Sequence, residues 1–230
     1  MTSGRDGLGA VVFDFDGLVI DSEWVIFETA VAAFAAHGHT LTVEAWSTIV
    51  GTNDEHVPDR WARLCEACGV SDFARADYEA AYEAQDRSNR DSLPALPGVV
   101  ALVEELASRG VPLGIASSSS RAWLDRHVGR LGLDRHFATL VGADLVGGVG
   151  KPAPDVYLKA CADLGADPRR AVALEDSAHG ATAAKAAGMA VVAVPSRITR
   201  WNDFSHADLV VDSLLDLSFE RLVAVVADRR

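Results

Sequence analysis

The stretch that decides the fold is "VVFDFDGLVIDSE", residues 11–23. Its apolar residues up to Phe15 predict a buried strand, but the carboxylates of Asp14 and Asp16 interrupt the run near its end. An aspartate at the end of a strand is often only a turn former or a helix cap. In an open parallel sheet, however, ligands bind beyond the carboxyl ends of the strands. The pair is therefore a candidate for a site at that edge.

Further along the chain, short apolar segments alternate with helical patterns. The apolar segments predict strands at 10–15, 111–117, 137–142, 171–176, 190–195 and 208–211. Between them, helical spacing of apolar residues predicts helices at 98–110, 154–164 and 177–187. This alternation is typical of an α/β fold, in which a Rossmann-like parallel sheet is covered by helices on both faces.

The alternation is interrupted between the first strand and about residue 93. The stretches "WVIFETAVAAFAAHG", "TVEAWSTIVG", "PDRWARLCEACG" and "DFARADYEAAYEAQ" all have helical patterns. We therefore expect a small all-α cap domain at 22–93, inserted into an α/β core domain made of 1–21 and 94–230. Two crossings side by side, at about 18–22 and 90–97, would form a hinge. Asp21 and Glu23 are expected to cap the first cap helix.

Composition and charge narrow the class of protein. The 230 residues are 49% hydrophobic, which is enough to bury a core, and the net charge is −12. Such an acidic surface argues against nucleic acid and anionic membranes as partners. The three cysteines are too few for a disulfide framework, so a cytoplasmic location fits best, and the N-terminus lacks a signal-peptide pattern. Cys65 and Cys68 are read as two small residues on a helix.

Three further stretches bring polar groups to the same predicted edge as Asp14 and Asp16. They are the serines 117–119, Lys151 in "GKPAPD", and the pair Glu175-Asp176. Taken alone, a serine run is usually a loop and a lone lysine is usually a solvated charge.

Clustered carboxylates need a cation, and a set of oxygen ligands suits Mg²⁺. A free carboxylate oxygen can attack phosphorus, and a second carboxyl can move the proton. A serine hydroxyl and a lysine can hold phosphoryl oxygens.

The stretches "DFDGLVIDSE", "IASSSS", "GKPAPDVY" and "LEDSAHG", in this order, resemble the four motifs of the haloacid dehalogenase-like (HAD) superfamily. The resemblance covers the chain from about residue 10 to 215 and is closest to the beta-phosphoglucomutase-like phosphatases. It implies a phosphoric monoester hydrolase with a cap domain. It assigns Asp14 as the nucleophile that becomes a phosphoaspartate and Asp16 as the general acid and base.

The resemblance also implies a metal and a phosphate site. Mg²⁺ would be bound by Asp14, by the backbone carbonyl of Asp16, by Asp176, and by Glu175 either directly or through water. The transferring phosphoryl group would be held by Ser117, Ser118 and Lys151.

Alternative activities on the same fold can be compared residue by residue. Dehalogenases lack the second aspartate of the first motif, and Asp16 is present. Phosphonate-cleaving relatives use a cap lysine, and the predicted cap contains none. A phosphosugar mutase of the beta-phosphoglucomutase type stays open, although Asp54 and Ile26 stand where it has an arginine and a histidine; Arg60, Arg87 or Arg90 could substitute. A non-catalytic binding protein is the remaining alternative. The presence of Asp14, Asp16, Lys151 and Asp176 argues against it.

The expected partner is a small phosphorylated metabolite, with a sugar phosphate favoured by the family. The cap would select the substrate, and the candidate contact residues are Gly51, Thr52, Asn53 and His56. We expect no nucleic acid or membrane partner, and a monomer or a weak homodimer.

Overall fold

The computed structural model describes residues 7–50, 60–84 and 92–229. Its core is a six-stranded sheet in which every neighbouring pair of strands is parallel, in the order β3-β2-β1-β4-β5-β6. The strands are β1 (Ala10–Phe13), β2 (Leu113–Ala116), β3 (Thr139–Val141), β4 (Ala171–Glu175), β5 (Ala190–Ala193) and β6 (Leu209–Val210). The predicted parallel α/β sheet is confirmed, and each strand is one to three residues shorter than its apolar segment.

Helices cover both faces of the sheet because alternate strand residues point to opposite sides. Val11 and Phe13 pack with residues of α5 (Val99–Ser108), α6 (Arg121–Arg130) and α9 (Phe219–Ala227). Ala10 and Val12 pack on the other face with α7 (Asp155–Asp163) and α8 (Ala178–Ala186). Short 3₁₀ helices η2 (Ala143–Val146), η3 (Pro168–Arg170), η4 (Thr199–Trp201) and η5 (Leu214–Asp216) lie in the connections.

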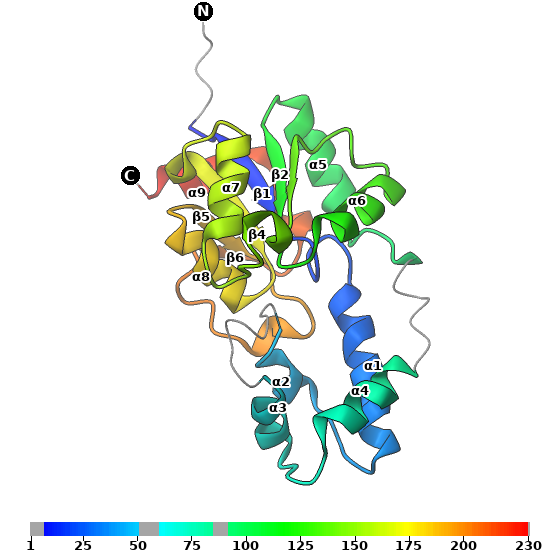
Figure 1. Ribbon diagram of the computed structural model, residues 1–230. Coiled ribbons are helices and arrows are strands. Elements are labelled where there is room, and N and C mark those ends of the chain that lie inside the picture. The colour runs from blue at the N-terminus through cyan, green and yellow to red at the C-terminus, as the bar shows by residue number, and fades with distance from the viewer. Residues whose placement is uncertain (1–6, 51–59, 85–91, 230) are drawn as a thin grey trace, which may run out of the picture.

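The segment after β1 forms a separate helical lobe, seen at the bottom of Figure 1. It contains α1 (Ser22–Ala36), α2 (Val43–Ser47), α3 (Arg60–Cys68) and α4 (Arg75–Glu83), and no strand occurs in its described residues. Its own apolar cluster is rich in aromatic side chains, including Phe27, Phe34, Trp46 and Phe73. We call this lobe the cap. Cys65 and Cys68 lie on α3, as expected.

The chain crosses between core and cap at two points that lie side by side. Ile20 and Ala95 form an isolated antiparallel bridge, and the amide of Leu96 donates to the carbonyl of Val19 over 2.8 Å. Two adjacent crossings allow rotation about the line that joins them. The domain boundaries at residues 22 and 93 stay a prediction.

Three features differ from expectation or were not foreseen. Asp21 stands at the N-cap position of α1, but its side chain makes no capping hydrogen bond and instead pairs with Arg197 over 2.6 Å. The expectation that Asp21 caps this helix is therefore wrong, whereas Glu23 does lie in the first turn. Helices α6 and α9 were not predicted. Among the described residues, no helix has the length and apolarity needed to span a bilayer.

Candidate active site

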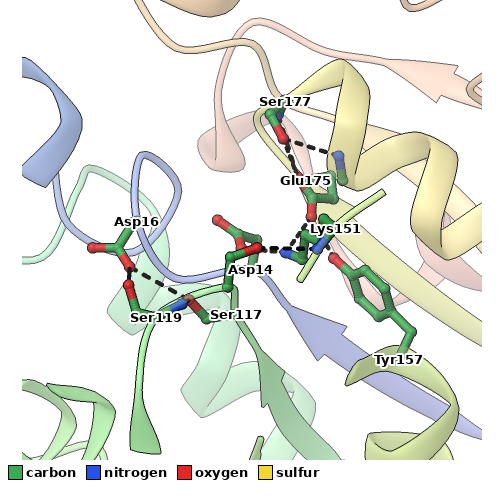
Figure 2. A network of polar contacts seen from close by, with 10 residues as sticks. Asp14, Asp16, Ser117, Ser119, Lys151, Tyr157, Glu175 and Ser177 are labelled. Atoms are coloured by element: carbon green, nitrogen blue, oxygen red, sulfur yellow. Dashed lines mark hydrogen bonds and ion pairs between the residues drawn. The ribbon is translucent and has the colours of Figure 1, made fainter. Parts of the chain in front are cut away.

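The predicted site residues come together because their strands are neighbours. Asp14 directly follows β1, Ser117 follows β2 and Glu175 is the last residue of β4, and β1 pairs with both other strands. The carboxyl ends of parallel strands meet at one edge of the sheet. Asp176 follows β4, and Lys151 reaches the same edge from the loop before α7. Figure 2 shows the side chains of Asp14, Lys151 and Glu175 turned toward one another at the strand ends.

Lys151 is the centre of a buried polar cluster. Its ammonium group donates to a carboxylate oxygen of Asp14 and to Oε1 of Glu175, the latter over 2.5 Å. The hydroxyl of Tyr157, on α7, donates to the same Glu175 oxygen over 2.5 Å. The other Glu175 oxygen accepts from the amide and hydroxyl of Ser177 at 3.3 and 3.2 Å. The Lys151 side chain is only 2% exposed, so its ammonium group contacts groups inside the site rather than solvent.

Burial controls the protonation of this cluster. The pKa of Asp14 is raised from 3.8 to about 8, chiefly because burial desolvates the carboxylate; the attraction of Lys151 opposes this rise and the negative charge of Glu175 adds to it. Burial, followed by the negative charges of Asp14 and Glu175, also raises the pKa of Asp176 well above its ordinary value. For Lys151, burial lowers the pKa, but Asp14 and Glu175 outweigh it and keep the ammonium charged. The cluster therefore has more carboxylates than cations to balance them.

The residues present fit a divalent cation. Asp14, Glu175 and Asp176 each offer a ligand atom within 4.8 Å of one another. With all three ionised, the single ammonium leaves two uncompensated negative charges, the number that Mg²⁺ would neutralise. Oδ2 of Asp176 is buried and has no hydrogen-bond partner in the described structure, which is costly for an oxygen without a ligand. Oxygen-only donors are the set that Mg²⁺ prefers.

Two glycines leave the space around these carboxylates open. A Cβ at Gly17, where φ is +93°, would collide with the Asp176 carboxylate, and one at Gly180 would collide with that of Glu175. The "DFDG" and "AHG" sequences therefore place a residue without a side chain beside each carboxylate. Substitution at Gly17 would add backbone strain to the collision.

Asp16 does not point toward Asp14 in this structure. Figure 2 shows its carboxylate turned to the serine segment, where Oδ2 accepts from the hydroxyl of Ser119 over 2.7 Å. Oδ1 accepts from the hydroxyl of Ser22 over 2.5 Å and from the indole of Trp123 over 3.1 Å. Asp16 is thus held by groups from the cap helix α1, from α6 and from the loop between β2 and α6.

Ser117 and Ser118 follow β2 and contact other residues of the site. Ser117 is 2% exposed; its hydroxyl accepts from the amide of Ser119 over 2.9 Å and is 3.4 Å from Oδ2 of Asp16. The hydroxyl of Ser118 accepts from the amide of Lys151 over 3.2 Å, so it joins two of the four predicted motifs. The candidate substrate residues Gly51, Thr52, Asn53 and His56 lie outside the described residues.

Several residues of the site were not foreseen. Trp123, Tyr157 and Ser177 contact predicted site residues. Ser177 caps α8 by accepting from the amide of Gly180, and a serine at the start of a helical pattern is a signal that sequence alone offers. Tyr157 and Trp123 contact residues far away in sequence, so no local pattern identifies them.

Comparison with known proteins gives a consistent result. Residues 11–194 match the family model described as haloacid dehalogenase-like hydrolase. Hexitol phosphatase B of Escherichia coli K12 is 34% identical over 218 residues, covering 93% of this chain and 96% of the relative. The phosphorylated carbohydrates phosphatase of Thermotoga maritima is 31% identical over 182 residues, covering 78% and 82%. A HAD family hydrolase of Deinococcus radiodurans R1, crystallised with bound phosphate and sodium, is 27% identical with a TM-score of 0.75, covering 96% and 98%.

Proposed function

The chain belongs to the haloacid dehalogenase-like hydrolases and is a phosphatase of that family, and from this premise we propose that it hydrolyses a small phosphomonoester with Mg²⁺ through a phosphoaspartate on Asp14. The observation that carries the proposal is the buried contact between Lys151, Asp14 and Glu175 at the carboxyl edge of the sheet. A buried carboxylate beside a buried cation and a partnerless carboxylate oxygen supports this proposal, because phosphoryl transfer is catalysed mainly by positioning and by charge stabilisation.

In the first half of the reaction, a carboxylate oxygen of Asp14 attacks the phosphorus of the substrate. The bond from phosphorus to the leaving oxygen breaks as the new bond to Asp14 forms. Asp16, protonated at this stage, gives its proton to the leaving oxygen, so an alcohol departs. Ser117, the Ser118 amide and Lys151 bind the non-bridging phosphoryl oxygens.

In the second half, Asp16 is a carboxylate and removes a proton from a water molecule. The water oxygen attacks the phosphorus, the bond to Asp14 breaks, and inorganic phosphate leaves with both residues restored. Asp14, the backbone carbonyl of Asp16, Glu175 and Asp176 would hold Mg²⁺. When bound, the ion would neutralise charge on the carboxylates and on the phosphoryl oxygens.

These roles require Asp16 to move. Its carboxylate accepts hydrogen bonds from Ser22, Ser119 and Trp123, on the side away from Lys151. A change of its side-chain torsions would bring the carboxyl group toward the leaving oxygen. One of the donors, Ser22, is the first residue of a cap helix, so motion of the cap would change how Asp16 is held.

A sugar phosphate is the substrate class that we favour. The names of two relatives, hexitol phosphatase B and phosphorylated carbohydrates phosphatase, point to phosphorylated carbohydrates. We assign the chemistry to a core domain of residues 1–21 and 94–230 and substrate selection to the cap of residues 22–93. A cap that covers the site excludes water from the reacting phosphoryl group.

The test is inorganic phosphate release from a panel of phosphorylated sugars, sugar alcohols and nucleotides, with Mg²⁺ and with EDTA. We expect Mg²⁺-dependent release that is abolished in Asp14→Asn. The matched control is Asp125→Asn, which removes an exposed carboxylate paired with Arg121 on α6. β-Glucose 1-phosphate belongs in the panel, with glucose 6-phosphate measured separately. Formation of glucose 6-phosphate without phosphate release would establish the mutase instead.

A further inference from the structure

The connection between β5 and β6 does not stay on the core. We call residues 196–202 the bridging segment. Its Ile198 is fully buried and belongs to the apolar cluster of the cap, together with residues such as Phe27 and Trp46. In Figure 1 this orange segment, which contains η4, descends from the sheet to lie beside α2. A core connection thus supplies one side chain to the interior of the cap.

Two polar residues, Arg197 and Asn202, fix the same segment to the cap and to the residue just before it. Arg197 pairs with Asp21 over 2.6 Å, and its guanidinium carbon lies 3.7 Å from the centroid of the Trp24 ring on α1. A guanidinium stacked on an indole is a favourable contact that Lys does not reproduce equally. The Asn202 side chain approaches the backbone carbonyl of Ser47, on α2, at 3.5 Å. The contacts therefore reach both α1 and α2.

The bridging segment is also tied to the carboxylate cluster. Thr199 is fully buried, and its hydroxyl donates to the backbone carbonyl of Asp176 over 2.5 Å. Thr199 and Ser196 exchange two further hydrogen bonds, of 2.9 and 3.3 Å, each from a backbone amide to the hydroxyl of the other residue. These contacts hold the segment rigidly at Asp176 while Ile198, one residue away, enters the cap.

A cap joined to the core only by two adjacent crossings could rotate about them. Ile20 and Ala95 mark these crossings. The contact of Arg197 with Asp21 lies beside the first crossing, but the contacts with Trp24 on α1, with the apolar cluster of the cap and with Ser47 on α2 lie away from both crossings. We propose that the bridging segment is a third, non-covalent connection that holds the cap in position over the carboxylate cluster. Ile198 and Arg197 would then be positioning residues for substrate binding.

The consequence for catalysis rests on the proposed function. The reacting groups lie at the carboxyl ends of core strands and in core loops, so weakening the contact with the cap should affect the chemistry on a minimal substrate less than it affects the binding of a larger substrate. A substrate that must be held by the cap should bind less well. For Ile198→Ala we expect KM for the best sugar phosphate to rise about tenfold, with kcat/KM for p-nitrophenyl phosphate changing less than about twofold.

The variants come in matched pairs. Arg197→Gln removes the contacts with Asp21 and Trp24, and Arg200→Gln removes the same charge three residues later, where the guanidinium lies 4.8 Å from the Trp201 ring. Ile198→Leu keeps the volume of the buried side chain and should restore KM. Hydrogen exchange of backbone amides provides a readout that does not depend on activity. We expect α1 and α2 to exchange faster in Ile198→Ala and Arg197→Gln than in Arg200→Gln, while strand amides are unchanged.

Two results would overturn the proposal. One is exchange in α1 and α2 that is the same in all variants, together with unchanged KM. The other is exchange that rises equally in the strands of the sheet, because the bridging segment would then stabilise the whole fold rather than seat the cap. If the wild-type protein released no phosphate from any substrate, the proposed function would fail. The exchange comparison would still decide the role of the bridging segment.

Discussion

At the scale of single residues, Lys151 carries the most consequential contact of the site. It is buried between Asp14 and Glu175, and removing its charge leaves these carboxylates without their ammonium partner. We expect Lys151→Met to lower phosphate release by a factor of about 100 or more, because a preorganised cation is lost where phosphoryl charge develops. Initial rates under saturating Mg²⁺ measure the effect. Lys159→Met, which removes a partly exposed lysine away from the site, is the control, and near wild-type rates in Lys151→Met would contradict its assigned role.

A substitution of Tyr157 tests whether its hydrogen bond to Glu175 contributes to stability. Its buried hydroxyl donates to Glu175, and burial, followed by the negative charge of Glu175, raises the pKa of the phenol well above its ordinary value. The hydroxyl therefore stays protonated and remains a donor throughout the usual pH range. Tyr157→Phe should lower the free energy of unfolding by about 1–3 kcal/mol, since a buried carboxylate loses a donor. Denaturant titration gives the value, and a variant as stable as wild type would show that another donor takes over.

At the scale of elements, the end of α7 offers a pH-dependent contact away from the site. Asp163 accepts from Lys159 at 2.9 and 3.1 Å and from Thr139 of β3 at 3.0 Å. The hydrogen bond from Lys159 is the main cause that lowers the pKa of Asp163 below its ordinary 3.8. A lowered carboxyl pKa gives stability that is present above 3.8 and is lost as the pH falls through the folded-state value.

We therefore expect Asp163→Asn to be destabilised relative to wild type at neutral pH and progressively less so below pH 3.8. Both side chains of the pair are about one-third exposed, so solvent screening limits the difference to about 0.5 kcal/mol. Denaturant titrations at several pH values measure it. A difference that grows on acidification would contradict the sign.

The elements that sequence could predict are those with strong local patterns. The apolar segments before Asp14 and Glu175 became strands, and their order along the chain placed both carboxylates at one edge. Helix α6 was missed because its pattern is diluted by arginines and a histidine, although Ser120 caps it and Leu124 and Val128 are buried on one side. The contact of Ile198 with the cap joins residues far apart in sequence, so no local pattern could reveal it.

The orientation of Asp16 shows the same limit within the site. Its position two residues after Asp14 made it a candidate for proton transfer. Which way its carboxylate turns depends on donors from α1, from α6 and from the loop after β2, which only the folded chain assembles. Sequence therefore identifies the chemical groups more readily than it identifies their arrangement.

At the scale of the whole molecule, the carboxylate cluster of the core is connected to the cap through the bridging segment. The uncompensated carboxylates near Lys151 lie at the carboxyl ends of the strands, and the bridging segment contacts both Asp176 and the cap. A cation at the cluster would relieve repulsion inside the folded protein and has no equivalent site in the unfolded chain. Binding to the folded state alone raises the free energy of unfolding by mass action.

This argument gives a prediction that needs no substrate. Mg²⁺ at about 100 times its dissociation constant should add about 2.7 kcal/mol to the free energy of unfolding. For a chain of this size, that corresponds to a rise in Tm of about 5–10 °C. Scanning calorimetry with Mg²⁺ and with EDTA measures the shift.

Asp176→Asn keeps the shape of the side chain but removes the charge of the carboxylate that carries the partnerless oxygen, and it should abolish most of the shift. Asp125→Asn should keep it, because its carboxylate lies on the surface of α6. An equal shift in all three proteins would mean that Mg²⁺ binds elsewhere on this acidic chain, and the carboxylate cluster would lose its assignment as the metal site.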